Sequence, residues 1–569
     1  MLILGVCNAI DSGACLLKDG KILAAVSEER FVRKKNIATF PKQSIKYILQ
    51  SQKLKPTDID WIGCGAWNGV DQLETLPRLI EDVIDQLENS PKDTKDIILQ
   101  RIKITGERDT AFKKELFEGL EDLGFPREKV ILCDHHYSHA LTAFYCSPYK
   151  EAYIFTADGR GDFRSVSLWS ATRIEGLKFI DMATELTSLG AMYGFITKLL
   201  GFTPDKHEGK VTGLAARGKQ TKAFEILKSG LWFDEEKGKI RSRIGDTYRP
   251  FISADWPEIH KKLAGFSRDD IAYAAQKLLE ETLMGFLIKH IGSKSKGSIN
   301  LCLAGGCMSN VKLNYELSNL PQVKSIYIFP QMGDGGNSLG GAINIALTKG
   351  NNIRHFGLPT VYLGPAYSNE EIKRVLESQK VSYIQVQSQD KIKKAVQFLI
   401  EGKLVGWYQG RMEYGPRALG ARSILAEATD KEITQILNQR LERSDFMPFA
   451  PVTIPEYADK CFVGWRQDHI SSRFMTICYQ CTPYLKSKCP AIVHVDGSAR
   501  PQVVFREQNP EYYEVVKSYI EQTGNPVLIN TSFNNHEEPI VNTPTDAINS
   551  LIKRNVDVLI AGDLIVSLK

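Results

Sequence analysis

The sequence lacks any long apolar run. No stretch approaches the ~18 consecutive apolar residues of a membrane-spanning helix, and the start, MLILGVCNAID, has neither a basic leader nor a cleavage site. Cysteine is scarce: eleven are scattered through 569 residues, an odd number that gives no sign of a disulfide framework. We therefore expect a cytoplasmic protein with reduced thiols and no membrane partner.

A strong excess of charge of one sign is also missing. The 72 Lys and Arg residues outnumber the 67 Asp and Glu residues by little, which leaves a net charge of +5. A protein that follows a nucleic-acid backbone usually has a concentrated basic face. We therefore expect no nucleic-acid partner.

Paired metal-binding cysteines are absent as well. One CxxC occurs, Cys478 and Cys481 in FMTICYQC, and no second pair follows at the spacing of a zinc knuckle. The alternation of apolar residues around it predicts a strand with structural thiols.

What the sequence does contain is a duplicated pattern of strands in a chain too long for one core. The opening residues predict three strands, LILGVCN, SGACLLKDG and KILAAVSEERF, joined by turns that contain Asp and Gly. A second copy begins near residue 151 with EAYIFTADGRGD, FRSVSLWSATRIEG and LKFIDMATEL. With helical segments between them, the copies predict two related α/β lobes that face a cleft.

The pattern changes near residues 350–362, where periodicity is lost and Gly, Pro and Asn increase. Before this point, residues 271–290 predict a helix, and SINLCLAGG and SIYIFPQMGDGG predict strands that run into glycine-rich loops. After it, a helix-then-strand pattern and the short strands RFMTICYQC, AIVHVD and VLIAGDLIVSL predict a second α/β domain with a mixed sheet. The predicted domains are residues 1–352 and 362–569.

Three of the ten histidines fall within CDHHYSHALTAF, residues 133–144. Asp134 is a good N-cap for a helix that starts at His135. At about 100° per residue, His135 and His139 lie about 40° apart on one helix face, one turn apart. That is the geometry two imidazoles need to share a metal ion. His136 with His139 is less well aligned, and capped or core histidines are the alternative.

Oxygen donors that would complete such a site follow two predicted strands. Asp158 ends the strand in FTADGRGD, and Asp334 lies in the glycine-rich loop PQMGDGGNSLGG. Each alone is typical of a turn Asp beside Gly, but both strand ends are expected to open on the same cleft. Two His and two Asp suit an iron, manganese or zinc ion with open positions for substrate oxygens.

Four ordered motifs, HHxxHA, TADGxGD, EGKVxGLA at residues 208–215 and PxxGDGG, resemble those of the nodulation-factor and antibiotic O-carbamoyltransferase family. Its first domain is similar to the TsaD-like enzymes of tRNA threonylcarbamoyladenosine synthesis, with a duplicated actin- and sugar-kinase-like fold. The resemblance implies that iron(II) is bound by His135, His139, Asp158 and Asp334. It also makes a homodimer an expectation.

The second half carries GWYQGRMEYGPRALGARSILA, residues 406–426. Its three arginines, Arg411, Arg417 and Arg422, alternate with glycines around a predicted strand–turn–strand. A guanidinium binds phosphate oxygens bidentately, and glycine lets the backbone approach an anion. We expect a cationic phosphate pocket, with a solvated basic face as the alternative.

The motif QGRxExGPRALGxRS makes this half resemble the family's YrdC-like domain. Further polar side chains of this half are candidate ligands: Arg443, His494, Arg500, Asn530, Thr531, Ser532 and Asn534. The last four follow the apolar strand PVLI, which would deliver them to a sheet end, where α/β sites lie. An ordinary surface turn is the alternative.

The resemblance implies a two-step reaction. The YrdC-like domain makes carbamoyl adenylate from carbamoyl phosphate and ATP, with Mg²⁺ on the ATP, and the TsaD-like domain transfers the carbamoyl group to a hydroxyl of a small-molecule acceptor. The implied catalytic residues are Asp11, Lys35 and Arg500. The implied ligands of ATP, carbamoyl phosphate or the adenylate are Lys35, Gly305, Gly306, Arg411, Arg417, Arg443, His494, Arg500, Asn530 and Ser532.

One position departs from the family pattern. The family's first turn usually carries a His near the reacting groups, whereas NAIDSGACLL has Ile10 there. Either another base takes the proton or the acceptor hydroxyl needs less help. Asp11, which matches the family Asp, and Asn8, if the turn shifts, are the candidates, and the role stays unassigned.

Other functions use the same folds. A tRNA threonylcarbamoyl enzyme would act on nucleic acid, which the mild charge disfavours. A hydrogenase-maturation carbamoyltransferase would carry paired CxxC motifs and an acylphosphatase-like start. A non-enzymatic actin-like nucleotide sensor would have decayed ligands, and Ile10 alone supports it. The acceptor pocket is expected among loops such as residues 65–110, which carry no readable code for the acceptor.

Overall fold

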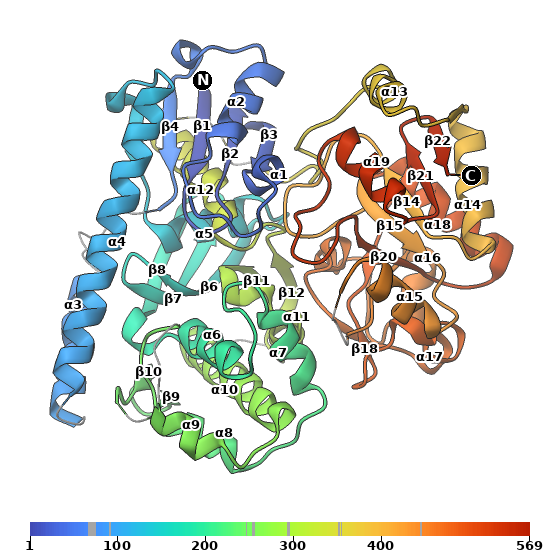
Figure 1. Ribbon diagram of the computed structural model, residues 1–569. Helices are drawn as coiled ribbons and strands as arrows, with labels where there is room; N and C mark the ends of the chain where they lie inside the picture. Colours follow the sequence, from blue (N-terminus) through green and yellow to red (C-terminus); the bar gives the residue numbers. More distant parts are fainter. Residues whose placement is uncertain are drawn as a thin grey trace. The chain divides into compact units, whose positions relative to one another are not determined.

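The computed structural model describes residues 1–66, 75–89, 93–245, 247–252, 257–292, 296–350, 353, 356–443 and 447–568 (Figure 1). The chain divides into two compact units: unit 1 is Met1–Leu23 and Asn36–Leu358, and unit 2 is Ala24–Lys35 and Pro359–Lys569. The expected domains were continuous in sequence, whereas here the short segment 24–35 packs within unit 2. Part of the predicted boundary, residues 351–352 and 354–355, lies outside the described residues.

Unit 1 contains two five-stranded sheets with the same strand order. The first has the order β3-β2-β1-β4-β5, and the second β12-β11-β6-β7-β8. In the first sheet, β1 pairs antiparallel with β2 and parallel with β4, and β4 pairs parallel with β5. In the second, β6 likewise pairs antiparallel with β7 and parallel with β11, and β11 pairs parallel with β12. The strands of the first sheet are β1 (Leu2–Cys7), β2 (Gly13–Lys18), β3 (Lys21–Ser27), β4 (Trp61–Cys64) and β5 (Val130–Leu132). Those of the second are β6 (Glu151–Gly161), β7 (Arg164–Thr172), β8 (Gly176–Thr184), β11 (Ile299–Ala304) and β12 (Val323–Ile328).

This repetition confirms the predicted duplicated α/β fold of the actin- and sugar-kinase-like type. The chain crosses between parallel strands through helical segments, as parallel pairing requires.

Two helices form the layer between the sheets. Helix α12 (Asn337–Thr348) packs on β1 and β4, α5 (His135–Tyr145) packs on β6 and β11, and the two helices pack on each other. Their approach is close because α12 has glycine at the contact: a Cβ on Gly340 would lie 2.4 Å from the carbonyl oxygen of Ser138. The layer therefore brings the segments that precede α5 and α12 near the end of β6.

The other helices of unit 1 cover the outer faces of the sheets and build a helical subregion. They are α2 (Lys42–Ser51), α3 (Thr75–Asn89), α4 (Thr94–Asp122), α6 (Leu189–Leu199), α7 (Glu208–Ala215), α8 (Lys222–Lys228), α9 (Pro257–Leu263), α10 (Arg268–Ile291) and α11 (Val311–Ser318), with a hairpin of β9 (Leu231–Asp234) and β10 (Lys239–Ser242). Helix α10 confirms the helix predicted over residues 271–290.

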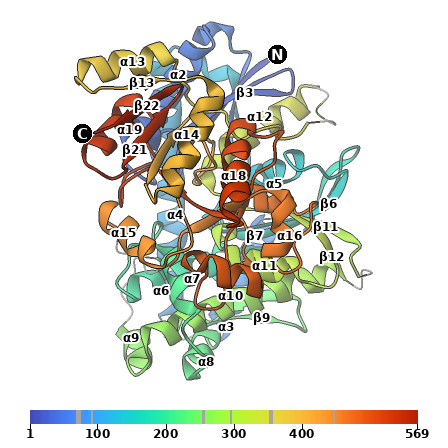
Figure 2. The ribbon, with the colours of Figure 1, turned by 90° about the vertical axis from the view of Figure 1, so that its right-hand side faces the viewer.

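Unit 2 is built on one eight-stranded mixed sheet of order β13-β22-β21-β14-β15-β20-β16-β19, which confirms the predicted mixed sheet. Helices α14 (Ser388–Ile400) and α18 (Pro510–Thr523) lie side by side (Figure 2) and share a core with Trp407 and Leu425 of the sheet. The strands are β13 (Ile384–Gln385), β14 (Val405–Tyr408), β15 (Arg422–Ala426), β16 (Ala450–Thr453), β19 (Gln502–Val503), β20 (Leu528–Ser532), β21 (Val558–Ala561) and β22 (Leu564–Ser567). The remaining helices are α1 (Glu29–Val32), α13 (Asn369–Ser378), α15 (Glu432–Arg440), α16 (Pro455–Cys461), α17 (Pro483–Lys488) and α19 (Pro544–Ile552).

Two strands predicted for this half are wrong in part. In RFMTICYQC, a 3₁₀ helix ends at Phe474, Met475 has a left-handed φ of 55°, and only β17 (Tyr479–Gln480) is a strand, paired with β18 (Ser498–Ala499). A residue with positive φ interrupts a strand. In AIVHVD, a 3₁₀ helix, Pro490–Ile492, takes the place of the strand, because proline fixes φ and lacks a ladder donor.

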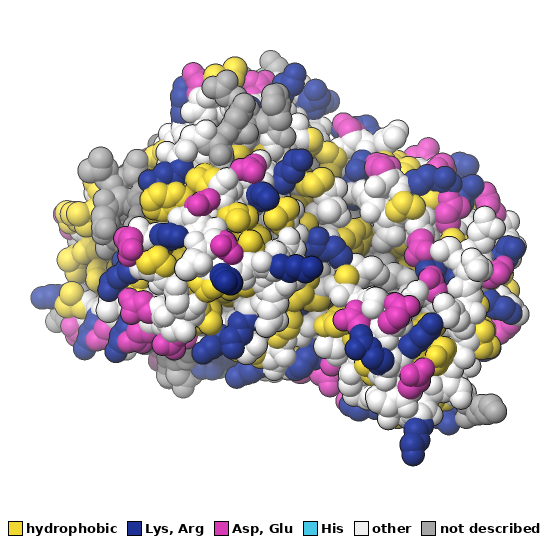
Figure 3. Space-filling view, turned by 90° about the horizontal axis from the view of Figure 1, so that it is seen from above, with side chains coloured by type: hydrophobic (Ala, Val, Ile, Leu, Met, Phe, Trp, Pro, Cys, Tyr) yellow, Lys and Arg dark blue, Asp and Glu magenta, His cyan; other side chains and the backbone are white. Residues whose placement is uncertain are grey.

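Surface charges of both signs are interspersed on the face shown in Figure 3. In the part of the chain that the structure describes, no helix combines the length and the apolar character needed to cross a membrane.

Candidate active sites

Helix α5 is held at both ends, which fixes its histidines. At its start, the Asp134 side chain accepts the Tyr137 N–H at 2.7 Å, and Asp162 Oδ2 accepts the His135 N–H at 2.9 Å. The predicted N-cap is therefore confirmed. At its end, the half-buried guanidinium of Arg173 donates to the carbonyl oxygens of Phe144 and Ser147. Backbone groups at both ends of the helix are hydrogen-bonded in this way, and the Phe144 carbonyl also accepts from Ser147 Oγ at 2.7 Å.

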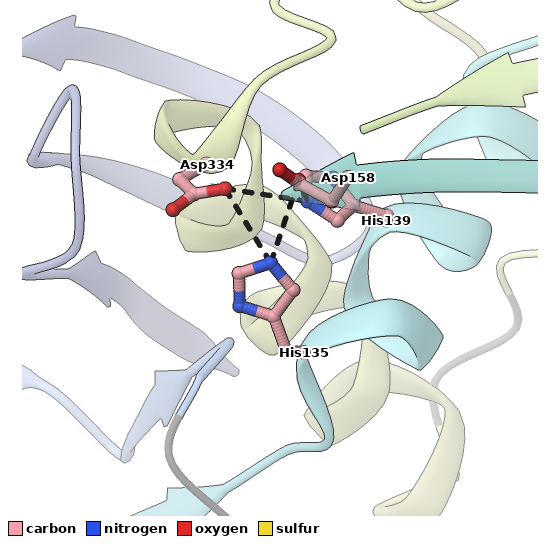
Figure 4. Close-up of side chains that lie close together, drawn as sticks. All are labelled: His135, His139, Asp158 and Asp334. Carbon is pink, nitrogen blue, oxygen red and sulfur yellow. Dashed lines mark hydrogen bonds and ion pairs between the residues drawn. The ribbon is translucent and has the colours of Figure 1, made fainter. Parts of the chain in front are cut away.

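The four predicted metal ligands lie together in unit 1 (Figure 4). His139 Nε2 is 3.2 Å from Asp158 Oδ2 and 3.5 Å from Asp334 Oδ1, and His135 Nε2 is 3.7 Å and 3.4 Å from the same two oxygens. Ligand atoms at about 2.1 Å from a tetrahedral metal are separated by roughly 3.4 Å. The donor set and its spacing therefore fit one transition-metal ion.

Both carboxylates of this cluster lie where a strand of the second sheet has ended or become irregular. The register of β6 with β7 shifts after Ala157, so Asp158 leaves the ladder. The Gly306 N–H then donates to Asp158 Oδ2 at 3.1 Å, and the Gly305 N–H donates to the Met332 carbonyl at 2.7 Å. These two glycines thus orient a cluster carboxylate and tie its loop to the loop that carries Asp334. Nucleotide binding by their amides stays a prediction.

The two histidines and the two aspartates of the cluster shift one another's pKa values, because they share one enclosed space. Burial alone lowers the pKa of His135, but the charges and hydrogen bonds of Asp334 and Asp158 outweigh it and raise that pKa well above its ordinary value. Burial raises the pKa of Asp158, and hydrogen bonds from His135 and His139 more than reverse this, so the pKa lies well below its ordinary value. Without metal, protonated histidine pairs with the ionised aspartates, and a metal ion must displace the protons to bind.

The third histidine of the motif lies outside this cluster. His136 Nδ1 is bound to Thr156 Oγ1 at 2.9 Å, and the ring is completely buried. Burial, followed by the charges of His135 and His139, lowers the pKa of His136 well below its ordinary value. His136 is thus a neutral core residue.

The two candidate bases of the first turn point to different places. Asp11 has a left-handed φ of 60°, and a Cβ on Gly333 would lie 3.6 Å from Asp11 Oδ2, so its carboxylate faces the loop of Asp334. Asn8 is completely buried, and its amide donates to Phe112 O and Glu115 Oε2 of α4 at 2.9 and 3.1 Å. A catalytic role for Asn8 or for Asp11 stays a prediction.

In unit 2, Glu413 organises the glycine-rich loop between β14 and β15. Its Oε1 accepts the backbone N–H groups of Leu419, Ala421 and Arg422 at 2.8, 2.7 and 3.1 Å. Asn530 Nδ2 donates to the Ala418 carbonyl at 3.1 Å from the opposite side. The loop is thereby held in one conformation with Arg417 on it.

Arg417 and Arg500 form a pair of like charges. Burial lowers the pKa of both guanidinium groups, and the charge of Arg500 lowers that of Arg417 further; the pKa of Arg500 is about 10. No hydrogen bond or ion pair joins either guanidinium to another of the described residues. Both side chains are half-buried. Two half-buried cations without a counter-charge among the described residues favour the binding of an anion near them.

The other two arginines of the motif have different surroundings. Arg422 is completely buried, lies 3.8 Å from the ring of Tyr408, and donates to the carbonyl oxygens of Gln409 and Pro365. Phosphate binding by Arg422 is therefore wrong, because its donors hold the loop instead. Arg411 donates to the Gly364 carbonyl at 3.2 Å and to that of Leu363, and phosphate binding by Arg411 stays a prediction.

Of the remaining predicted ligands of unit 2, Arg443 lies at the end of β20. Arg443 donates to Thr531 Oγ1 at 2.9 Å and to Ser532 Oγ at 3.1 Å. Burial lowers the pKa of Lys35, and the charge of Arg443 lowers it further, so Lys35 lies among the cations of unit 2. His494 Nδ1 is 3.3 Å from Asp496 Oδ1, while its Nε2 is buried and has no hydrogen bond to any of the described residues.

The sequence reasoning missed the residues that hold these groups in place. Glu413 stands inside the quoted arginine motif, so the motif carried a signal for it. No motif gave a signal for Gln502 or Asn337. Gln502 donates to the Leu419 carbonyl and accepts from Asn530. The Asn337 amide is 3.3 Å from His139 Nε2. Their roles depend on contacts between distant segments.

Comparisons with known proteins cover nearly the whole chain. Residues 2–343 match the family model described as carbamoyltransferase N-terminus, and residues 396–568 match that described as carbamoyltransferase C-terminus. An uncharacterised protein of Synechocystis sp. is 31% identical over 98% of this chain and 95% of its own length. Nodulation protein NolNO of Sinorhizobium fredii is 31% identical over 98% and 78%.

Solved structures are distantly similar. Thermococcal HypF ("T.kodakarensis") is 12% identical with a TM-score of 0.32, over 61% of this chain and 48% of that one. Component A of (R)-2-hydroxyglutaryl-CoA dehydratase from Acidaminococcus fermentans is 13% identical with a TM-score of 0.34, over 60% and 97%. Because the two family models together account for most of its length, this chain belongs to the carbamoyltransferase family and is a transferase.

Proposed function

We propose that this carbamoyltransferase is an ATP-dependent O-carbamoyltransferase that acts on a hydroxyl of a small-molecule acceptor. In unit 2, carbamoyl phosphate, ATP and one water give carbamoyl adenylate, phosphate and pyrophosphate. In unit 1, the acceptor oxygen attacks the carbamoyl carbon, and AMP leaves.

The observation that carries the proposal is the Arg417–Arg500 pair. Two half-buried guanidinium groups without a counter-charge among the described residues favour a polyanion, and each presents a planar fork that fits phosphate oxygens. Arg443 and Lys35 add cationic charge in the same unit. Mg²⁺ on the ATP would complete the neutralisation of the phosphates.

The cluster of His135, His139, Asp158 and Asp334 supports the transfer half of the proposal. Iron(II), or manganese or zinc, bound there would supply a Lewis acid for the carbamoyl carbonyl or for the adenylate phosphate. Within this chain, Gly306 keeps Asp158 in position, and Asp162 and Asp134 keep α5 in position.

The test measures pyrophosphate release with carbamoyl phosphate, ATP and no acceptor. The wild type should release pyrophosphate, and Arg417→Met and Arg500→Met should each slow release about 10²-fold, the effect of losing one preorganised donor. Arg506→Met is the matched control, because Arg506 is exposed and pairs with Glu514. A wild type that releases no pyrophosphate would contradict the proposal, and the sensor alternative predicts that result.

The acceptor is proposed to be a small molecule rather than tRNA. The net charge of +5 and the interspersed charges on the face in Figure 3 offer little for a nucleic-acid backbone. Addition of tRNA should leave pyrophosphate release and carbamoyl transfer unchanged.

A further inference from the structure

Helix α4 of unit 1 buries a row of polar side chains where an amphipathic helix normally buries apolar ones. Arg101, Thr105 and Asp109 follow one another at intervals of four residues, and all three are buried. In Figure 1, α4 is the long helix that runs alongside both sheets of unit 1. A buried polar row of this kind needs partners for each of its members.

Two members of the row have such partners. Arg101 Nη2 is 3.2 Å from Glu185 Oε2 and Thr105 Oγ1 donates to Glu185 Oε1 at 2.9 Å. Arg101 Nη1 also donates to the Pro250 carbonyl at 3.1 Å. Arg101, Thr105 and Glu185 thus form a network that holds α4 to the segment after β8.

Asp109 is different. Its side chain is 8% exposed, its Oδ2 is completely buried, and neither oxygen has a hydrogen bond or ion pair with another of the described residues. A buried carboxylate without a donor destabilises a fold. Such groups persist where a ligand supplies the missing donor.

A contact of the preceding turn of α4 places Asp109 near the segment that carries Asp158: Arg160, two residues after Asp158, donates to Thr105 Oγ1 at 3.4 Å. Charges from several elements act on Asp109. They come from Asp162 between β6 and β7, Glu185 after β8, His135 at the start of α5 and Lys113 on α4. Burial, followed by the charges of Asp162 and Glu185, raises the pKa of Asp109 from 3.8 to about 7. Asp162 itself accepts the His135 N–H, so the charges that act on Asp109 include those at the start of α5, which carries a cluster histidine.

We propose that Asp109 binds the acceptor in unit 1, accepting the hydrogen bond of the attacking hydroxyl and taking its proton. This inference rests on the proposed function and fills the role that Ile10 leaves open. The acceptor oxygen forms a bond to the carbamoyl carbon, the bond between that carbon and the adenylate oxygen breaks, and AMP leaves with the electron pair. The proton of the hydroxyl moves to a carboxylate oxygen of Asp109.

The test compares two nucleophiles in Asp109→Asn, which keeps the shape of the side chain. Glycerol is the hydroxyl probe, and hydroxylamine is the probe whose nitrogen attacks without a base; carbamoylated glycerol and hydroxyurea are measured by mass spectrometry. Loss of a positioned base costs about 10²-fold or more. We expect that loss for glycerol, a change of less than about threefold for hydroxylamine, and unchanged pyrophosphate release.

Asp122→Asn is the control, because Asp122 is an exposed carboxylate at the end of the same helix. Equal carbamoylation of glycerol by Asp109→Asn and Asp122→Asn would overturn the inference. So would a parallel loss of both products, which indicates a structural role. If the wild type released no pyrophosphate at all, the proposed function would fail instead, and the two failures are therefore distinguishable.

Thermal unfolding gives a second readout that needs no acceptor. Because the pKa of Asp109 is raised in the folded state, its ionisation destabilises the fold progressively as the pH rises from about 4 to about 7. The melting temperature of Asp109→Asn should therefore exceed that of the wild type by an amount that grows over this range and is constant above it. A lower melting temperature at pH 8 would show that Asp109 is needed for the structure and would overturn the inference.

Discussion

Replacement of Glu413 by alanine should release the loop that carries Arg417. The change removes one carboxylate oxygen that accepts three backbone N–H groups, those of Leu419, Ala421 and Arg422, at 2.7–3.1 Å. All three residues are buried. A buried donor left without a partner costs about 1–3 kcal/mol, so three cost roughly 3–9 kcal/mol. Water that enters the vacated space restores one or two of these hydrogen bonds. We therefore expect a loss of stability of about 3–5 kcal/mol, in the lower part of this range.

Hydrogen exchange followed by mass spectrometry measures this effect locally. A loss of about 3 kcal/mol corresponds to roughly 10²-fold less protection of the amides in the peptide that spans residues 414–426. Pyrophosphate release should fall with it, because Arg417 loses its fixed position. Glu401→Ala is the control, since Glu401 is exposed and its carboxylate is bonded only to the side chains of Lys403 and Gln397 among the described residues. Equal protection in both variants would refute the reasoning.

Two further substitutions test how the metal cluster is held. In Gly161→Ala the new Cβ would lie 2.1 Å from the ring of His135, so the ring must move and bound metal should fall well below one equivalent by elemental analysis. In Gly159→Ala the new Cβ meets no atom of the described residues within 4 Å, so this variant should keep its metal. Equal metal contents in the two variants would contradict the account. In Arg173→Met the Ser147 carbonyl loses its guanidinium donor, whereas the Phe144 carbonyl keeps that of Ser147 Oγ. The change should cost about 1–3 kcal/mol in urea unfolding, and a change below about 0.5 kcal/mol would contradict it.

The sequence predicted those parts of the fold that depend on local patterns. The two copies of three strands, helix α10 and the helix after Asp134 follow from alternation, periodicity and capping, and all are present. The four cluster residues also come together, because each stands at the start of a helix or at the end of a buried strand. Local pattern failed near Met475 and Pro490, where a left-handed residue and a proline replace predicted strands with short 3₁₀ helices.

The sequence did not predict the contacts between segments that lie far apart along the chain. Arg422 shared its motif with Arg417, yet one guanidinium is bound to carbonyl oxygens and the other faces Arg500. Lys35 was expected in the first domain, and its segment packs within unit 2. Asp109 stands in a stretch with no recognisable motif, and its position became apparent only from burial and from the charges of three other elements.

The most direct test of the two-site account is the double variant His135→Ala/His139→Ala, assayed for metal content, for pyrophosphate release and for carbamoyl transfer to hydroxylamine. The account predicts loss of bound metal and of hydroxyurea formation, with pyrophosphate release from carbamoyl phosphate and ATP retained, because the adenylate is made by residues of unit 2. Retained metal, or loss of pyrophosphate release in a folded double variant, would contradict it.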